Sequence, residues 1–168
     1  MVDSYKILYK GGSGELVEKK SRFIADLRPV ASEEEAPEYI EEIRKKYWDA
    51  SHPCFAYIIG DRGQSARCSD DGEPSQTAGK PMMDVLAGEE LHDVCAVVTR
   101  YFGGTLLGTG GLVRAYSGAV KEGIKNCVIL EKKLAVRLNI TTDYSGVGTI
   151  QYIEAQGGLE TMDTRYKD

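Results

Sequence analysis

The sequence lacks the features that define several classes of protein. No apolar run among its 168 residues approaches the roughly 18 residues that a membrane-spanning helix needs. The start, from Met1 to Lys6, has no apolar core of a signal peptide, and no glycine period, internal repeat or low-complexity tract indicates a fibre or an array. Because 42% of the residues are hydrophobic and 28% are charged, the chain is too apolar to be disordered. We therefore expect a globular cytoplasmic protein that has no membrane partner.

Cysteine and histidine are too few and too scattered to indicate a metal centre or a disulfide framework. The four thiols are Cys54, Cys68, Cys95 and Cys127, and no two of them form a Cys-x-x-Cys pair. Without an export signal, they are expected to be reduced. His52 lies near Cys54, and His92 lies near Cys95, but Cys95 belongs to an apolar run in which thiols are usually inert. Because no Gly-x-Ser-x-Gly elbow is present either, we expect no catalytic residue of these kinds, no metal and no cofactor.

Charge is distributed unevenly along the chain. The net charge of −5 argues against a protein that coats nucleic acid over its whole surface, but it leaves room for a local basic patch. The stretch from Val94 to Lys121 contains no acid. Another stretch contains six acids and no base, namely Glu33, Glu34, Glu35, Glu38, Glu41 and Glu42. This polarity predicts an acidic helix, Glu33–Glu42, on one part of the surface and a basic region on another.

Hydrophobic periodicity predicts a mixed α/β (α+β) chain. We expect strands at 15–18, 22–27, 53–60, a stretch ending near 68, 94–99, 132–142 and 159–166, and helices at 33–47, 77–87, 111–125 and 146–155. A capping box formed by Ser32 and Glu35 opens the first helix. The continuous β-branched run from Val94 to Thr99 predicts a buried central strand.

An acidic loop precedes the second predicted helix, with three acids in four positions: Asp70, Asp71 and Glu73. Such a cluster can bind a hard cation through its oxygen atoms. Alternatively, the carboxylates cap the following helix and stay solvated, as in most loops of this composition. A phosphate-binding P-loop is excluded because six residues separate Gly72 from Gly79, where that motif has four, and Pro81 occupies the place of the hydroxyl.

A glycine-rich segment follows the predicted central strand and leads into a helix. This arrangement can form an anion site, because glycines let the backbone approach a ligand and free N–H groups point outward. Arg100 at the strand end and Arg114 in the first helical turn would add charge-assisted contacts to a phosphate. Glycines serve tight turns and close packing equally well, but the absence of nearby acids favours an anionic partner. No acid follows about 20 residues later, which excludes a dinucleotide fingerprint.

A basic stripe follows from helical spacing, because Lys121 and Lys125 succeed Arg114 on the side opposite the core. Exposed lysines usually do no more than keep a helix soluble, but here they join other cations that can follow a nucleic-acid backbone. The candidate RNA- or anion-binding residues are Arg67, Lys80, Arg100, Tyr101, Gly103, Gly104, Gly108, Gly110, Gly111, Arg114 and Lys121.

These two segments resemble the YigZ/IMPACT family. The matching motifs are Ser69-Asp70-Asp71-Gly72-Glu73-Pro74, Thr77-Ala78-Gly79-Lys80-Pro81, Val97-Val98-Thr99-Arg100-Tyr101-Phe102-Gly103-Gly104 and Leu107-Gly108-x-Gly110-Gly111-Leu112-Val113-Arg114-Ala115-Tyr116. The resemblance extends over residues 1 to about 128 and is that of a bacterial member. Gln76 stands where the family often has glycine, which bears on the conformation of that turn alone.

The resemblance implies a fold and a role in translational control. Residues 1–130 would form an N-terminal domain like a ribosomal-protein domain and domain IV of elongation factor G. Residues 131–168 would be part of a C-terminal ferredoxin-like domain. The family has no established enzymatic activity, and its eukaryotic members act in translational control by competing for the activator of a stress-responsive initiation-factor kinase. For bacterial members, RNA or ribosome binding is implied by likeness of fold alone.

Three functions are therefore open at this stage. The first is a non-enzymatic RNA- or ribosome-binding module in the regulation of translation. The second is an enzyme that acts on an anionic, phosphorylated small molecule, in which Asp70, Asp71 or Glu73 holds a cation or serves as base. The third is a protein-interaction module in translational stress control that uses the acidic helix Glu33–Glu42.

The C-terminal segment is expected to be half of a domain. Residues 132–168 supply one strand–helix–strand unit, and a two-stranded unit with one helix has little core. We therefore expect the chain to be a shortened version of a longer protein. The half-domain would pack on residues 1–128, pair with another chain through its open strand edge to form an oligomer, or be poorly ordered.

Overall fold

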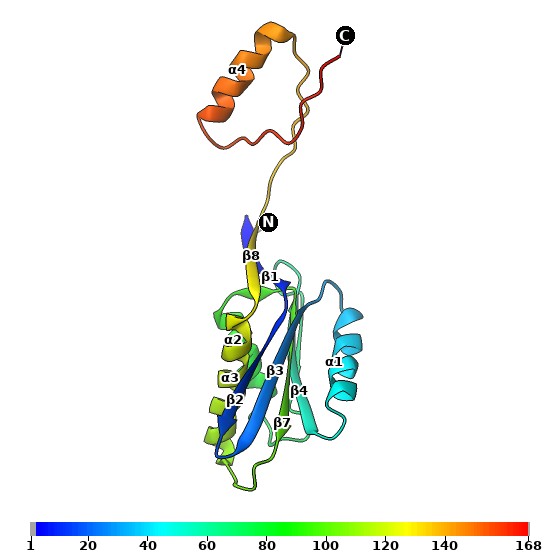
Figure 1. Ribbon diagram of the computed structural model, residues 1–168, viewed down its shortest axis with the longest axis vertical. Helices are drawn as coiled ribbons and strands as arrows, with labels where there is room; N and C mark the ends of the chain where they lie inside the picture. Colours follow the sequence, from blue (N-terminus) through cyan, green and yellow to red (C-terminus); the bar gives the residue numbers. More distant parts are fainter. Residues whose placement is uncertain (1–2, 168) are drawn as a thin grey trace. The chain divides into compact units, whose positions relative to one another are not determined.

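Strands and helices build two units along the chain, Met1–Leu134 and Ala135–Asp168, in a computed structural model that describes residues 3–167 (Figure 1). The first unit contains β1 (Ser4–Lys10), β2 (Gly12–Glu18), β3 (Ser21–Pro29), α1 (Glu35–Lys46), β4 (Ser51–Ile59), β5 (Ser65–Ser69), α2 (Gly79–Gly88), β6 (Leu91–His92), β7 (Val94–Tyr101), α3 (Gly108–Lys125) and β8 (Val128–Lys133). The second unit contains α4 (Tyr144–Ala155). Within residues 3–167, no helix combines the length and the apolar character that crossing a membrane requires.

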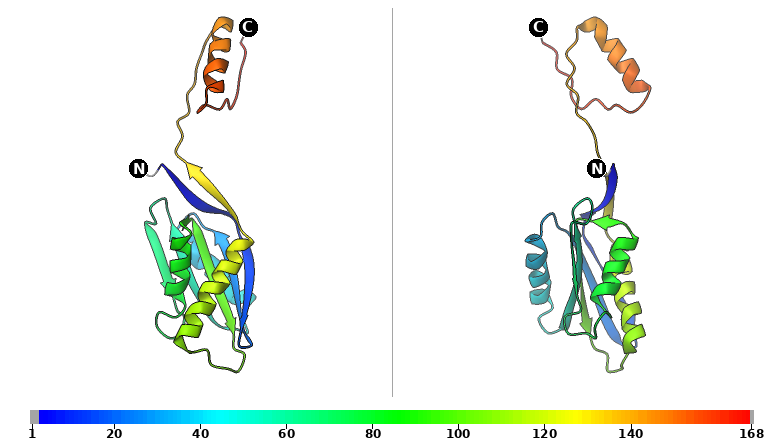
Figure 2. Two further views of the ribbon diagram at one scale, coloured as in Figure 1. Left: turned by 90° about the vertical axis from the view of Figure 1, so that its left-hand side faces the viewer. Right: turned by 180° about the vertical axis from the view of Figure 1, so that it is seen from behind.

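A five-stranded sheet with the order β2-β3-β7-β4-β5 forms the centre of the first unit. Each neighbouring pair in it is antiparallel. Figure 2 shows α1 on one face of this sheet, and α2 and α3 on the opposite face. A smaller sheet with the order β6-β1-β8 lies beside it. The first unit is therefore a three-layer α/β arrangement, and the expected mixed fold is confirmed.

The strand β7 supplies the hydrophobic core on both faces of the sheet. Val94, Ala96 and Val98 pack in the cluster that α2 and α3 cover. Cys95 and Val97 alternate with them and pack in the cluster that α1 covers. Because helices cover both faces, every side chain of the run is buried and the run reads as continuously apolar. The prediction of a buried central strand is confirmed.

The helices begin two or three residues from their predicted starts, and the differences for α1 and α3 have structural consequences. α1 begins at Glu35, and no side chain caps it; instead the Glu35 carboxylate accepts a hydrogen bond from the backbone N–H of Ala31 at 2.8 Å. Pro37 lies in its first turn, where the missing N–H costs no intrahelical hydrogen bond. α3 begins at Gly108, three residues earlier than predicted. Arg114 therefore lies in the second helical turn instead of the first.

The predicted C-terminal strands at 132–142 and 159–166 are wrong. The strand β8 ends at Lys133, where its pairing with β1 ends, and residues 134–143 and 158–167 contain no strand. The alternating apolar residues of this region stay exposed, as Val136 does at 81%. A strand requires a neighbour for its backbone hydrogen bonds, and the second unit offers none. The predicted helix forms as α4, and the Asp143 carboxylate caps it by accepting from Gly146 N–H at 2.9 Å.

We expect the backbone amides of α4 to exchange with deuterium faster than those of α3. α4 has no buried residue, so its local opening exposes little additional apolar surface, whereas α3 buries a whole face against the sheet. Hydrogen–deuterium exchange read by mass spectrometry measures this difference within one sample. Equal protection of the two helices would contradict the expectation.

Candidate functional site

The acidic loop is tied into the fold by the carboxylate of Asp70. Its two oxygens accept hydrogen bonds from the backbone N–H groups of Gln76, Ala78 and Gly79 at 2.8, 3.0 and 2.8 Å. These donors lie at the start of α2, where N–H groups have no partner within the helix. For Asp70, the expectation that a loop carboxylate caps the following helix is confirmed.

Glu73 forms a buried ion pair with Arg100. Glu73 Oε1 accepts a hydrogen bond from Arg100 Nη1 at 2.7 Å and another from the hydroxyl of Tyr116 at 2.8 Å. The side chains of Glu73 and Arg100 are only 5% and 12% exposed. The guanidinium also lies over the rings of Phe23 and Phe102, each at 5.5 Å. The two charges therefore pair within the protein, although Arg100 Nε is buried without a hydrogen-bond partner among the described residues.

Cys54 and Tyr116 extend this buried polar cluster and are held in their neutral forms. The Cys54 thiol donates a hydrogen bond to the carbonyl oxygen of Asp70 at 2.9 Å and lies 3.5 Å from the Tyr116 hydroxyl. Burial raises the pKa of Cys54 to about 12. Burial also raises the pKa of Tyr116, and the neighbouring Cys54 and Glu73 raise it further. A protonated, buried thiol is a poor nucleophile, so this cluster is suited to holding the loop.

Asp71, the remaining acid of the loop, contacts other residues. Its carbonyl oxygen lies 2.6 Å from His52 Nδ1, and its carboxylate lies 3.6 Å from Arg44. A Cβ at Gly72 would lie 2.7 Å from the His52 ring, so the loop requires glycine there. Asp70, Asp71 and Glu73 thus have separate partners, and among residues 3–167 no cluster of three or more His, Cys, Asp and Glu residues could hold a metal ion.

Some glycines after β7 allow close packing of the backbone, and others leave the backbone exposed to solvent. At Gly103, a Cβ would overlap the carbonyl group of Lys20, and its N–H donates to the Ser21 hydroxyl at 3.0 Å. Gly104 and Gly108 have φ angles of 87° and 72°, which glycine adopts at little cost. Nothing lies within 4 Å of a Cβ built on either of them. The first three residues of α3, Gly108 to Gly110, are therefore exposed, whereas Gly111 is buried and is not accessible to a ligand as predicted.

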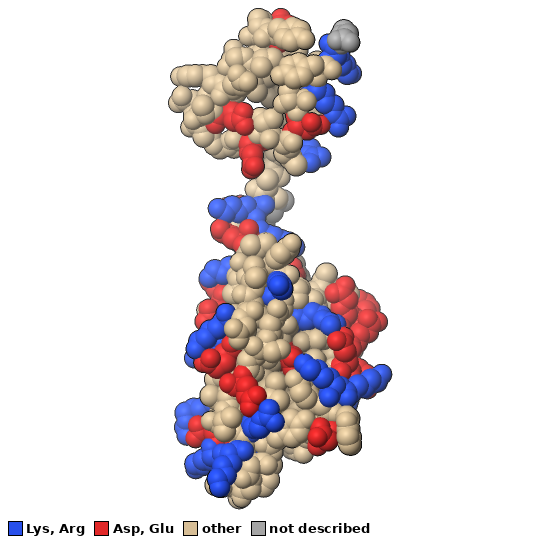
Figure 3. Space-filling model, in the orientation of Figure 1, with Lys and Arg blue, Asp and Glu red and all other residues tan. Residues whose placement is uncertain are grey.

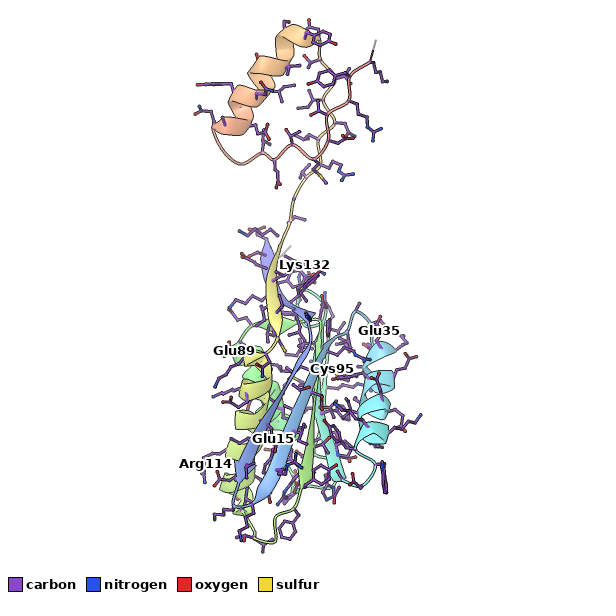
Figure 4. All side chains as sticks on the ribbon, viewed as in Figure 1. Glu15, Glu35, Glu89, Cys95, Arg114 and Lys132 are labelled. Carbon is purple, nitrogen blue, oxygen red and sulfur yellow. The ribbon has the colours of Figure 1, made fainter. Side chains whose placement is uncertain are left out.

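The structure separates the predicted cations into paired and unpaired groups. Arg114 and Lys121 are exposed on α3 and form no ion pair within residues 3–167. Figure 4 shows Arg114 near the end of α3 that follows the glycine-rich loop. Lys80 pairs with Asp84 on the surface of α2. Arg67 is exposed on the edge strand β5, away from α3 in the chain and in the sheet.

The acidic residues of α1 lie on the opposite face of the sheet. Figure 3 shows Asp and Glu side chains gathered over the N-terminal half of this helix. Glu42 forms a two-armed hydrogen bond with Arg28 at 2.7 and 2.8 Å, and Glu41 lies 3.3 Å from Arg44. Glu38 is exposed and has no ion-pair partner among the residues that the structure describes. The clustered acids of α1 and the unpaired cations of α3 therefore lie on opposite faces of the sheet.

Comparison with known proteins places the geometry in a family context. The model of the Impact N-terminal domain matches residues 19–124. The chain is 47% identical over 151 residues to the IMPACT family member YvyE of Bacillus subtilis (strain 168), covering 90% of this chain and 70% of that protein. It is 38% identical over 151 residues to the IMPACT family member YigZ of Escherichia coli (strain K12), covering 89% and 74%. A crystal structure of a hypothetical protein matches 99% of this chain and 82% of its own, with a TM-score of 0.75 and 34% identity.

Replacing Glu73 by Gln is expected to lower the free energy of unfolding by about 3–5 kcal/mol, because it leaves the buried Arg100 charge without a counter-ion. Urea denaturation followed by circular dichroism measures the change. The matched control is Asp84→Asn, which breaks the exposed pair with Lys80 and should cost at most about 1 kcal/mol. Similar small losses in both variants would show that the buried pair does not hold the loop.

We expect stability to fall as the pH rises above 9. Burial raises the pKa of Cys54 and of Cys95 from the ordinary value of 9.0 to about 12. Between pH 9 and 12 the unfolded thiols lose their protons while the folded thiols keep them, so the unfolded state binds fewer protons and is favoured. Urea denaturation under reducing conditions should show a shallower alkaline decline in the Cys54→Ala/Cys95→Ala variant than in the parent. An unchanged decline would contradict the assignment.

Proposed function

The chain belongs to the IMPACT family, and from that premise we propose that it is a non-enzymatic RNA- or ribosome-binding module that acts in the regulation of translation. The role in translation follows the resemblance to eukaryotic members of the family. The binding partner is argued from the charges and contacts of this chain. RNA presents a line of phosphates, so its recognition needs exposed cations and free N–H groups on one surface.

The observation that carries the proposal is the combination of free donors and unpaired cations at α3. Gly108, Thr109 and Gly110 at the start of the helix are exposed, and the first turn contains no acid. Arg114 and Lys121 project from the same helix without ion pairs among the described residues. In addition, no acid occurs anywhere between Val94 and Lys121. All of these groups would attract the anionic backbone of RNA, and no residue of this segment would repel it.

The predicted site residues take different roles in this proposal. Arg114 and Lys121 contact phosphates directly, together with the backbone at Gly104, Gly108 and Gly110. Arg100 acts as a positioning residue, since Glu73 holds its guanidinium and fixes the loop that follows. Arg67 and Lys80 would contact only RNA that extends from α3 to β5.

An enzyme that uses the acidic loop receives less support. Asp70 is bound to three backbone N–H groups, and Glu73 is bound to Arg100 and Tyr116. A general base must be free to accept a proton from a substrate, and a cation ligand must have an oxygen to offer. A protein-interaction role has one observation in its favour, the exposed and unpaired Glu38 on α1.

Reversing the charge of Arg114 and Lys121 is expected to weaken binding to ribosomes and to short RNAs of any sequence alike. Removing two phosphate contacts should reduce the slope of log affinity against log salt concentration by about 2. Co-sedimentation with ribosomes and RNA titrations at low and moderate salt measure both quantities for Arg114→Glu/Lys121→Glu.

The matched control is Lys10→Glu/Arg62→Glu, which makes the same change of net charge at exposed positions outside α3. It should bind almost as well as the parent. Absence of RNA and ribosome binding at low salt, or binding that ignores salt, would exclude the proposed function. Binding of a protein partner that is lost on reversing Glu38 would support the interaction module instead.

A further inference from the structure

Three connections meet at one end of the first unit. We call this end, formed by residues 18–21, 47–50 and 102–107, the loop end. Its parts are fastened together, because the Tyr101 hydroxyl donates to the Asp49 carboxylate at 2.8 Å and the rings of Tyr47 and Tyr101 meet edge to face at 6.5 Å. Gly103 packs directly on the backbone of Lys20 and Ser21. The loop end is thus a built surface of three separate segments, at the lower end of the sheet in Figure 1.

The turn between β2 and β3 places two lysines in an unfavourable backbone conformation. Glu18 pairs with Ser21 across the turn, so Lys19 and Lys20 are its two central residues. Their φ angles are 45° and 66°, and a two-residue turn with positive φ at both positions strongly prefers Asn-Gly. Lysine has no conformational advantage there. Both side chains are exposed, and neither forms an ion pair in the part of the chain that the structure describes.

The other two connections expose large aromatic side chains. Trp48 is 83% exposed and Phe102 is 58% exposed. Each is next in sequence to a residue of the Tyr47–Tyr101 contact, which holds its backbone in place. The Trp48 ring is left to solvent, and the Phe102 ring is partly exposed beside the Arg100 guanidinium. Trp48 is also the only tryptophan of the chain. Phe102 belongs to a family motif, but none of these four residues is among the RNA-binding residues predicted from the sequence, although two adjacent lysines at the tip of a short hairpin are a signal.

We propose that the loop end binds an unpaired segment of RNA. Lys19 and Lys20 contact phosphates, and Trp48 and Phe102 stack on exposed bases. Cations beside aromatic rings are the combination that proteins use for single-stranded nucleic acid, because every base offers a face for stacking. A duplex hides those faces within its own stack. This inference rests on the proposed function, which it deepens by naming the class of RNA and a surface beyond α3.

The surrounding charges are compatible with an RNA ligand. Of the nearby acids, Asp49 is engaged by Tyr101, and Glu15 forms an ion pair with Arg22 at 2.7 Å. Glu18 is the remaining exposed acid of the turn, against the two adjacent lysines. Lys and Arg side chains gather where β2 meets β3 in Figure 3. The glycine-rich loop leads directly from Phe102 into the first turn of α3, so RNA at the loop end can continue toward Arg114.

The test is a titration of the whole chain with RNAs of about 12 nucleotides, a length that one small binding domain can cover. One RNA is single-stranded and the other is a duplex of equal length. Trp48 fluorescence and the polarisation of a dye on the RNA are followed in parallel at about 50 and 200 mM salt. We expect saturable quenching of Trp48 by the single strand, tighter binding of the single strand than of the duplex, and loss of affinity at the higher salt.

The decisive variant is Lys19→Asn/Lys20→Gly. It removes both charges and supplies the residues that the turn prefers, so weaker binding cannot be attributed to unfolding. The salt slope for single-stranded RNA should fall by about 1.4. Trp48→Ala and Phe102→Ala should each weaken binding by about 5- to 150-fold, the range expected for a lost base stack. Tyr9→Ala is the control, because it removes a 64% exposed aromatic ring from β1.

The outcomes separate this inference from the proposed function. If polarisation reports RNA binding but these variants bind like the parent and Trp48 is not quenched, the loop end is not the site and the proposed function stands. If the duplex binds as tightly as the single strand, stacking on exposed bases is excluded. If ribosomes sediment with the chain while free RNA does not bind, a ribosomal protein is the partner and the inference is wrong. If neither binds at low salt, both the inference and the proposed function fail.

Discussion

The ion pair between Glu73 and Arg100 holds together segments that lie far apart in the sequence. Glu73 comes from the acidic loop, Arg100 from the end of the central strand β7, and Tyr116 from α3. Removing two charges from water is costly, and the pair is tolerable only because short hydrogen bonds and aromatic faces replace the lost hydration. With this pair in place, the loop before α2 and the loop after β7 have one arrangement relative to each other. The exposed surface that follows β7 depends on that arrangement.

The motif residues that identify the family are mostly turned inward. Asp70 caps α2, Glu73 and Tyr116 surround Arg100, and Gly103 allows the β7–α3 loop to approach the β2–β3 turn. Such residues explain why the fold forms, and they leave partner recognition to the side chains that the fold presents. Under our proposals, the groups that meet a partner are the exposed cations of α3 and the lysines and aromatic residues of the loop end. The family motifs therefore contain residues that build the fold, such as Glu73, and an exposed residue that we propose as a partner contact, Arg114.

The clustered acids of the sequence and its unpaired cations lie on different faces of the protein, because α1 and α3 cover opposite faces of the sheet. α1 carries most of the clustered acids on one face, and α3 carries unpaired cations on the other. Under the proposed function, an anionic ligand binds the second face, although the net charge of the chain is −5. A small negative total thus gives no guide to where an anion can bind. The local arrangement of the charges decides it.

The sequence by itself determined the positions of most elements of residues 11–130, the buried central strand and the family. These properties follow from local periodicity, turn residues and ordered motifs, and each of these patterns lies within a single stretch of the chain. It could not give the C-terminal strands correctly, since alternation shows which side chains are apolar but cannot supply a neighbouring strand. It likewise could not show that Glu73 and Arg100 are paired, because they lie 27 positions apart. Only the tertiary structure decided these contacts. It alone brought the lysine turn, Trp48 and Phe102 to one end of the first unit, because residues distant in sequence meet only where the packing of the sheet and its helices places them.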